Sequence, residues 1–392
     1  MNDAIQFTAR SAVELAPWML AVALLGVLAF GAASWAVAWK LTHPRHQRSR
    51  RTIVSVGRVA RGGALELPCT PETSAPGTYG LWLDDGAVHV RVGGVVTQSR
   101  HTVTRTCEAV RGERPRARQI FQWSRVAYVD PEALGLPCER FFPAPGAPLA
   151  WHVPTMNQGS TRWAIHIHGL GSSAAATLAS FITFREAGYH SLTTTYGDPR
   201  RTTLGQDEHI DIDRLVHYAV TNGATSIILV GWSMGAAIAR PLIDSSIHAP
   251  LIHGVLLVSP MLDWRNTVDH AARVTRIPRF IARAGLSWVA HPRLSRTVGL
   301  RQPIDVDAMS WFGGVPVSTL ILHSPNDRTT PYADSATLAA ESSVQVTLRT
   351  LAAPMHTTEW NVAPDACSDM LANWLHRFEA VAQTDGFHES SV

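Results

Sequence analysis

The chain has 392 residues, of which 46% are hydrophobic and 17% are charged. This composition is typical of a globular protein with a sizeable core and excludes a disordered chain. The formal net charge of +3 at pH 7 is too small to indicate nucleic-acid binding, and the sequence has no zinc-ligand spacing or RNA-binding aromatic motif. Lys40 is the only lysine, which excludes a serine–lysine dyad and Schiff-base chemistry within the folded domain.

An apolar segment without charges runs from Pro17 to Trp39. As a helix rising ~1.5 Å per residue it spans roughly 34 Å, enough to cross a hydrocarbon core of ~30 Å. A cleaved signal peptide is the alternative interpretation. However, the preceding residues lack the basic region of a signal peptide, and the apolar segment exceeds the usual ~7–15 residues. The pattern therefore favours an uncleaved, single-pass membrane anchor.

The charges on either side of this segment predict its orientation. Only Arg10 is basic on the N-terminal side, whereas the C-terminal side carries Lys40, Arg45, Arg48, Arg50 and Arg51. The positive-inside rule then places the residues after position 40 in the cytoplasm. We expect residues 1–51 to form the anchor and its basic flank, and the protein to lie in the cell membrane.

Residues 52–125 are expected to form a small β-rich region without recognisable chemistry. Alternating or β-branched runs occur at Thr52–Val59, Gly80–Leu83, Ala87–Val92 and Thr102–Thr106. Asp85-Gly86 separates two of these runs and is a hairpin signal. The pair Gly93-Gly94 is expected to end the third run.

From residue 126 to about 384, strand-like and helix-like segments alternate, which predicts a mostly parallel sheet with helices on both faces. The expected strands are Leu149–Val153, Arg162–His168, Ser191–Tyr196, Ser226–Val230, Gly254–Ser259, Val317–His323 and Val344–Leu351. The expected helices are Ala174–Ala187, Glu208–Asn222, Met234–Asp244, Tyr332–Ser342 and Pro364–Ala382. Residues 385–392 are expected to form a C-terminal tail.

The most informative motif is Gly231-Trp-Ser-Met-Gly235. A buried strand is expected before it and a helix after it, and in this context G-x-S-x-G indicates a nucleophile elbow. The sharp turn exposes the Ser233 hydroxyl at a helix N-terminus, where free N–H groups and the helix dipole stabilise negative charge. We therefore predict that Ser233 is a nucleophile.

A serine nucleophile needs a base, and the base needs an acceptor that fixes its tautomer. Asp327 lies in a turn-rich loop after the expected strand Val317–His323, and His356 follows the last strand. These positions predict Asp327 as the acid and His356 as the base. Asp263, after the preceding strand, is the rival acid.

The loop His168-Gly-Leu-Gly-Ser172 follows another expected strand, and its glycines allow backbone N–H groups to face a substrate. We expect the N–H groups of Leu170 and Met234 to form an oxyanion hole. His166 and His168 share one strand face, but the sequence places no third ligand near them. We therefore expect no metal or other cofactor, and His168 is expected to order the loop.

These segments together resemble the α/β-hydrolase superfamily. The resemblance covers residues 126–384, and the region around Tyr128–Leu136 and Pro148–Pro154 is similar to bacterial membrane-anchored members. It implies an α/β-hydrolase fold and a cofactor-independent Ser-Asp-His hydrolase, with Ser233, Asp327 and His356 on the catalytic positions. The serine argues against the dehalogenase and epoxide-hydrolase branches, which use aspartate. Since the superfamily acts on many substrates, the resemblance does not identify one.

An insertion between Ser259 and Val317 is expected to form a cap at about residues 263–312. Its apolar residues have helical spacing around Arg273–Ala290, and it contains eight arginines and four aspartates. A cap over the serine would create an apolar pocket and exclude water. Its arginines are expected either to face solvent or to lie near anionic lipid.

The expected function is hydrolysis of a carboxylic ester, with an acyl or lipid-like small molecule as substrate. A peptidase of the same fold would use the same residues. A catalytically silent, membrane-tethered binding module is the alternative from another class.

Overall fold

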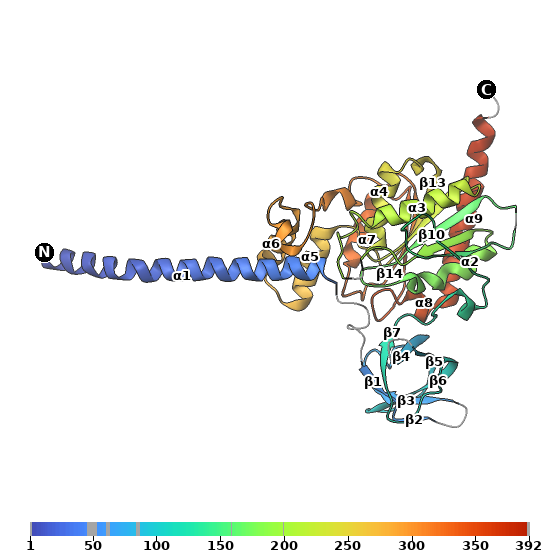
Figure 1. The fold of residues 1–392 in the computed structure, drawn as a ribbon, viewed down its shortest axis with the longest axis horizontal. Helices are drawn as coiled ribbons and strands as arrows, with labels where there is room; N and C mark the ends of the chain where they lie inside the picture. The colour runs from blue at the N-terminus through green and yellow to red at the C-terminus, as the bar shows by residue number, and fades with distance from the viewer. Residues whose placement is uncertain are drawn as a thin grey trace.

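The computed structural model describes residues 2–44, 53–59, 63–83, 87–157, 159–198 and 200–389. A long N-terminal helix, a small β domain and an α/β domain follow one another along the chain (Figure 1). The basic residues 45–51, the Asp85-Gly86 turn and the last three residues of the expected tail lie outside the described residues.

Helix α1 (Asn2–Thr42) contains the predicted apolar segment. The part Pro17–Thr42 is long and apolar enough to cross a membrane. Apolar side chains along it are exposed; Leu20, for example, is 72% exposed. Towards its C-terminal end the helix contacts the rest of the protein, and Ser34, Ala38 and Thr42 are buried there.

The β domain is a seven-stranded antiparallel sheet that curls around its own core (Figure 1). Its strand order is β1-β7-β4-β5-β6-β3-β2, with bounds β1 Ile53–Ser55, β2 Arg58–Val59, β3 Leu65–Pro68, β4 Tyr79–Leu83, β5 Val88–Gln98, β6 Thr102–Arg111 and β7 Ile120–Ser124. The β-rich prediction is confirmed. The expected break at Gly93-Gly94 is wrong, because β5 continues through it and absorbs the irregularity as register shifts against β6.

The α/β domain contains an eight-stranded mixed sheet in the order β15-β14-β13-β12-β10-β11-β9-β8. The strands are β8 Glu139–Phe141, β9 Ala150–Val153, β10 Arg162–Ile167, β11 His190–Thr194, β12 Ser226–Trp232, β13 Ile252–Val258, β14 Ser318–His323 and β15 Val346–Thr350. Strands β10 to β15 are parallel, and β9 and β8 form an antiparallel edge. The parallel strands therefore end at one common edge, where their loops meet.

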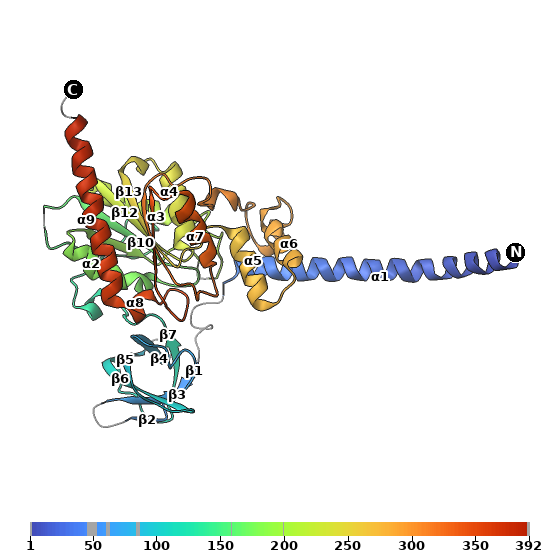
Figure 2. The ribbon, with the colours of Figure 1, turned by 180° about the vertical axis from the view of Figure 1, so that it is seen from behind.

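Helices cover both faces of this sheet, as predicted (Figures 1 and 2). One face carries α3 (His209–Thr221), α4 (Gly235–Ser245) and α7 (Tyr332–Glu341). The other carries α2 (Phe181–Glu186), α8 (Glu359–Val362) and α9 (Pro364–Glu389). Successive residues of β12 alternate between the two cores, since Leu229 packs on one side and Val230 on the other. Helix α9 extends beyond the expected domain end at 384.

The insertion between β13 and β14 forms α5 (Trp264–Thr275), α6 (Arg279–Ala290) and two 3-10 turns, Ser295–Val298 and Asp307–Met309. Its outer helix α6 packs on α1. The rings of Phe30 and Phe280 stack with centroids 5.9 Å apart, and a Cβ at Gly285 would lie 2.5 Å from Val37. The insertion thus lies between the sheet and the apolar helix (Figure 1).

Candidate active site

Ser233 lies in a sharp turn between β12 and α4. Its φ of 54° is a left-handed value that is uncommon for residues other than glycine. Two backbone hydrogen bonds hold the turn: the Ser233 N–H donates to Val258 O over 3.0 Å, and the Met261 N–H donates to Ser233 O over 3.0 Å. Ser233 therefore lies in the sharp strand-to-helix turn that the sequence predicts.

Three glycines crowd around this turn, and each lacks room for a side chain. A Cβ at Gly231 would lie 2.8 Å from Ala236 N, and one at Gly235 would lie 2.3 Å from Ile167 O. A Cβ at Gly169 would lie 2.9 Å from the Cβ of Ser233. Close backbone packing thus explains both glycines of G-x-S-x-G and the first glycine of the facing loop.

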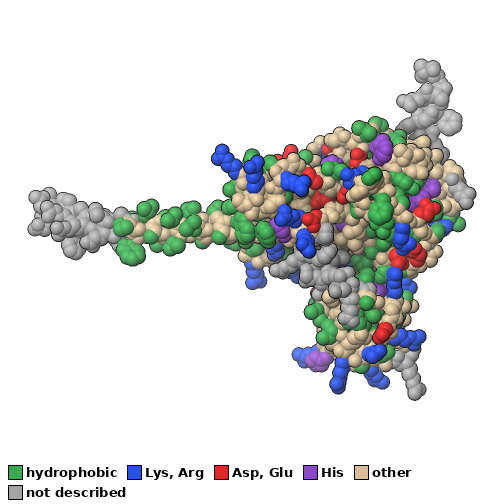
Figure 3. Space-filling view, in the orientation of Figure 1, with side chains coloured by type: hydrophobic (Ala, Val, Ile, Leu, Met, Phe, Trp, Pro, Cys, Tyr) green, Lys and Arg blue, Asp and Glu red, His purple; other side chains and the backbone are tan. Residues whose placement is uncertain are grey.

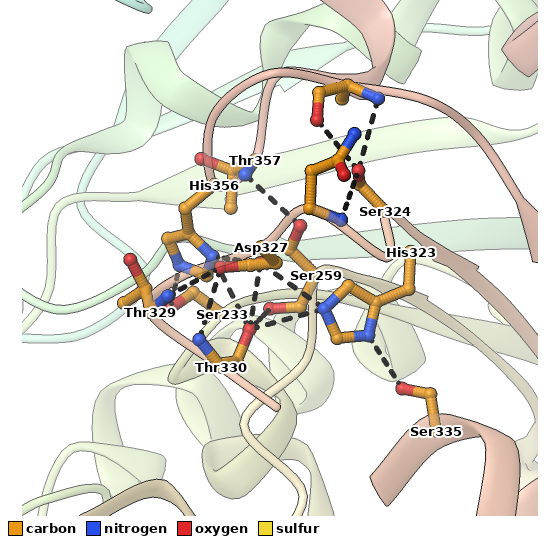
Figure 4. A network of polar contacts seen from close by, with 12 residues as sticks. Ser233, Ser259, His323, Ser324, Asp327, Thr329, Thr330, Ser335, His356 and Thr357 are labelled. Carbon is orange, nitrogen blue, oxygen red and sulfur yellow. Dashed lines mark hydrogen bonds and ion pairs between the residues drawn. The ribbon is translucent and has the colours of Figure 1, made fainter. Parts of the chain in front are cut away.

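The structure brings Ser233, His356 and Asp327 together in one chain of hydrogen bonds (Figure 4). His356 Nε2 lies 2.8 Å from Ser233 Oγ, and His356 Nδ1 lies 2.6 Å from Asp327 Oδ2. Because a carboxylate only accepts, Nδ1 carries the proton of that bond, which leaves Nε2 to accept from the serine hydroxyl. The rival acid Asp263 instead caps α5 by accepting from the Asn266 N–H over 2.9 Å.

A cavity of about 810 Å³ opens over Ser233 and His356. Its wall is mainly apolar, and the β domain, the α/β domain and the insertion each contribute large side chains to it: Trp123, Leu134, Leu170, Ile182, Met261, Trp264, Met355 and Trp360. Of the cap insertion, only Met261, Trp264 and Thr267 reach the wall. The insertion therefore covers one side of the cavity, while its outer part contacts α1.

A model of the alpha/beta hydrolase family matches residues 164–385, more than half of the chain. The chain belongs to the α/β hydrolase family. Residues 52–124, the β domain, match a domain of unknown function, DUF8805. A search of curated proteins found no match.

Among solved structures, the hydrolase is similar to the esterase Pf2001 of Pyrococcus furiosus, with 17% identity, a TM-score of 0.47, and coverage of 64% of this chain and 94% of that chain. It is also similar to a putative esterase from Staphylococcus aureus, with 12% identity, a TM-score of 0.43, and coverage of 61% and 82%. For Est1E from Butyrivibrio proteoclasticus the identity is 14%, the TM-score 0.42, and the coverage 62% and 99%.

In this α/β hydrolase, Asp327 is held by five hydrogen bonds. Its Oδ2 accepts from His356, from His323 Nε2 at 3.2 Å and from Thr330 Oγ1 at 3.0 Å. Its Oδ1 accepts from the N–H groups of Thr329 at 2.7 Å and Thr330 at 3.2 Å. Burial opposes ionisation, but the neighbouring His356 and the hydrogen bonds outweigh it and hold the pKa of the carboxyl below its usual value. Asp327 is therefore a carboxylate with a fixed orientation.

The imidazole of His356 is neutral near pH 7. Burial lowers the pKa of His356, the charges of Arg125 and His323 act in the same direction, and Asp327 opposes them. A neutral imidazole with a free lone pair on Nε2 is the form that accepts a proton from a hydroxyl.

His323 is a site residue that sequence reasoning missed. It ends β14, four residues before Asp327, and is fully buried. Its Nδ1 lies 2.8 Å from Ser335 Oγ while its Nε2 faces Asp327 (Figure 4). A histidine at the carboxyl end of the strand that leads into the loop of Asp327 was the available signal.

Leu170 and Met234, the predicted oxyanion-hole residues, line the cavity beside Ser233. Among the residues that the structure describes, neither backbone N–H has a hydrogen-bond acceptor, so both are available to a ligand. His168 braces this loop: its ring Nδ1 donates to Gly169 O over 2.8 Å, and it stacks on Tyr196 with centroids 3.9 Å apart. Burial lowers the pKa of His168 to about 4, so the ring is neutral.

His166 does not share a ligand set with His168. It is fully buried between Ser180 Oγ at 3.3 Å and Ser191 Oγ at 3.2 Å. Within the described residues, no group of three histidine, cysteine or acidic side chains is arranged to hold a metal ion.

Proposed function

We propose that this α/β hydrolase is a serine hydrolase that cleaves carboxylic esters with an acyl or lipid-like portion. The observation that carries the proposal is the continuous contact from Ser233 through His356 to Asp327 at the floor of a largely apolar cavity. A tethered module without catalysis has no need for a buried base aligned between a hydroxyl and a carboxylate.

In the proposed reaction, Ser233 Oγ attacks the ester carbonyl carbon while its proton moves to His356 Nε2. Asp327 stabilises the resulting imidazolium, and the N–H groups of Leu170 and Met234 bind the oxyanion. One such donor contributes about 2.7–4 kcal/mol of transition-state stabilisation. The C–O bond then breaks, and the departing alkoxide takes the proton from Nε2. A water molecule then gives a proton to the same nitrogen and attacks the acyl carbon. The bond between this carbon and Ser233 Oγ breaks, Oγ takes the proton back from Nε2, and the acid is released.

The proposal extends to location. The exposed apolar surface of Pro17–Thr42 supports a single-pass anchor, and the basic residues that follow it support a cytoplasmic α/β domain. Exposed arginines of the insertion lie beside the end of α1, where anionic headgroups would meet them (Figure 3). We place them at that headgroup layer.

Labelling with a fluorophosphonate probe tests the proposal. The wild-type protein should be labelled, Ser233→Ala should not, and Ser287→Ala, which removes an exposed hydroxyl on α6, should be labelled like wild type. Hydrolysis of p-nitrophenyl esters should fall by roughly 10⁴–10⁶-fold in Ser233→Ala.

The same assays separate the alternatives. A wild-type protein that resists the probe would favour a binding module. Faster cleavage of aminoacyl or peptidyl amides than of esters with graded chain length would favour a peptidase.

A further inference from the structure

The β domain lies against the segment that carries His356. In both ribbon views, β4 and β7 lie next to α8, which begins three residues after that histidine (Figures 1 and 2). The two domains therefore meet at the loop that holds the base.

Arg125 makes the contact closest to the base. It follows β7 directly, and its Nη1 donates to the backbone carbonyl of His356 and, over 2.6 Å, to Thr357 Oγ1. Thr357 has a φ of 57°, a conformation that is unfavourable for a β-branched residue. A guanidinium from the β domain thus secures the strained position next to His356.

A second set of contacts fixes the far end of the same segment. Asn361 Nδ2 donates to Thr78 O over 2.6 Å and to Arg125 O over 2.8 Å, and the Thr78 N–H donates back to Asn361 O over 2.9 Å. A Cβ at Gly77 would lie 1.9 Å from Asn361 O. Close backbone approach across this interface therefore requires a glycine.

On the other side of the base, Met355 packs against the core of the β domain. The segment 355–361 is consequently held by the β domain both before and after His356.

The part of the β domain that makes these contacts is itself rigidly held. Arg105 is fully buried, and its guanidinium donates to the carbonyls of Thr73 at 2.9 Å and Ala75 at 2.7 Å and to that of Gly77. These hydrogen bonds fix the loop that ends at Thr78. The β domain also completes the cavity wall, through Glu72, Thr78, Trp123, Ser124 and Arg125.

We propose that the β domain is a positioning domain, in which Arg125 is the residue that holds the His356 loop in register with Ser233. This inference rests on the proposed serine-hydrolase function. Arg125 acts through the backbone of the base and is a positioning residue. A base must lie within hydrogen-bond reach of the proton that it removes, and small displacements of such a group lower rates about 10²-fold.

The charge of Arg125 allows a second test of the proposal, through the pH dependence of the reaction rate. The charged or titratable groups that face His356 are Asp327, His323 and Arg125, and Arg125 acts to lower the pKa of His356. Without this charge the pKa of His356 rises, so the acid limb of the pH–rate profile should move to higher pH. Loss of packing would also reduce the burial of His356 and raise its pKa, so Arg125→Lys, which keeps the positive charge, separates the effect of the charge from that of packing.

The experiment uses the full-length protein in detergent and compares Arg125→Ala, Arg125→Lys and Asn361→Ala with the control Arg116→Ala. Arg116 is an exposed arginine of the same domain. We expect Arg125→Ala to lower kcat and the labelling rate of Ser233 by about 10–100-fold, with KM changed less than kcat, and to shift the acid limb upward. Arg125→Lys should restore the position of the acid limb and part of kcat. Asn361→Ala should lower kcat without moving the limb.

The outcomes separate the two proposals. If wild type is not labelled, the serine-hydrolase function fails. If wild type is labelled and folded Arg125→Ala matches Arg116→Ala in rate and pH profile, the positioning role is overturned. If Arg125→Ala does not fold, Arg125→Lys and Asn361→Ala decide: wild-type kcat in both would overturn the proposal, and reduced kcat in both would support it.

Discussion

Three non-glycine residues around the site have a left-handed backbone conformation: Ser233, Ser259 and Thr357, with φ of 54°, 44° and 57°. Such conformations cost of order 1–3 kcal/mol each and persist only where the surroundings fix them. Here the fixing contacts are specific, since Ser259 Oγ accepts from the Thr357 N–H over 3.1 Å. The strain is therefore local to the turn of Ser233 and the loop of His356.

The hydroxyl of Ser259 also contacts the buried carboxyl group of Glu359, which the proposed reaction does not use. Ser259 Oγ donates to Glu359 Oε1 over 2.6 Å, and Glu359 is fully buried. Burial raises the pKa of Glu359 to about 7, although the hydrogen bond from Ser259 opposes this. Glu359 is thus protonated in the folded protein at pH values where the unfolded chain ionises it.

This difference gives a pH-dependent stability. The pKa of Glu359 is raised from 4.5 to about 7 in the folded protein. The contribution of protonated Glu359 to folding stability is therefore complete below pH 4.5 and is lost as the pH rises through 7. The loss is about 3 kcal/mol. Relative to Glu359→Gln, the free energy of unfolding of wild type should fall by this amount between pH 4.5 and 8, as measured by urea denaturation. Glu341→Gln, at an exposed position, is the matched control. A wild-type-to-Gln difference that stays constant with pH would contradict the buried-carboxyl assignment.

At the scale of elements, the sequence predicted the strands and helices whose signals are local. The run Ser226–Val230 is apolar and β-branched, and two glycines follow at the spacing of a sharp turn, so β12 and α4 were recognisable. The positions of Asp327 and His356 near Ser233 could be predicted from the rule that loops meet at the carboxyl ends of parallel strands.

Contacts between distant segments were not predictable in this way. Arg125 and His356 are 231 positions apart, and nothing in the local pattern of Arg125 indicates a partner after the last strand. The stretch Arg273–Ala290, whose apolar residues have helical spacing, contains the end of α5 and all of α6. The two helices are separate because Arg276 adopts a left-handed φ of 58° and Pro278 precedes α6. The sequence of the insertion gives no sign that α6 packs on α1.

The elbow element offers a direct test of its packing. Replacing Gly235 by alanine places a Cβ 2.3 Å from Ile167 O, a backbone atom that cannot move aside cheaply. We expect Gly235→Ala to destabilise the protein by about 1–3 kcal/mol, and the displaced turn should slow labelling of Ser233. Thermal denaturation and the fluorophosphonate rate measure the two effects.

Gly94 provides the control for this substitution. It lies in β5 with no atom within 4 Å of an added Cβ and no positive φ, so Gly94→Ala should leave both quantities close to wild type. Equal thermal stability and equal labelling rates of the two variants would contradict the close packing of Gly235 against Ile167 O.

At the scale of the whole molecule, the insertion connects the α/β domain to α1. Trp35 Nε1 donates to Thr297 O over 3.4 Å, and Phe30 stacks on Phe280, whose side chain is still 64% exposed. Phe280 and the exposed arginines of the insertion therefore lie near the C-terminal part of the apolar helix α1. This combination of an aromatic ring with arginines is typical of surfaces at a membrane interface.

The arginines at this surface are the basis of the final prediction. Arg276, Arg293 and Arg296 are exposed, whereas Arg279 and Arg283 form ion pairs with Asp269. A basic residue near an anionic bilayer contributes about 1 kcal/mol of attraction. For the full chain in vesicles containing phosphatidylglycerol, replacing the three exposed arginines by glutamine should lower hydrolysis of a long-chain ester several-fold. Hydrolysis of a soluble short-chain ester should be unchanged, because the contacts of Ser233 are untouched.

A variant with the same change of net charge controls for nonspecific electrostatics. Arg58, Arg100 and Arg116 are exposed on the β domain, which lies apart from the apolar part of α1 (Figure 1). Their replacement by glutamine should leave the long-chain rate closer to wild type. In vesicles of neutral phosphatidylcholine the two triple variants should behave alike, since no anionic surface attracts either set. Equal long-chain rates for wild type and both variants in the anionic vesicles would contradict contact between the insertion and the membrane surface. They would indicate that the arginines of the insertion face solvent.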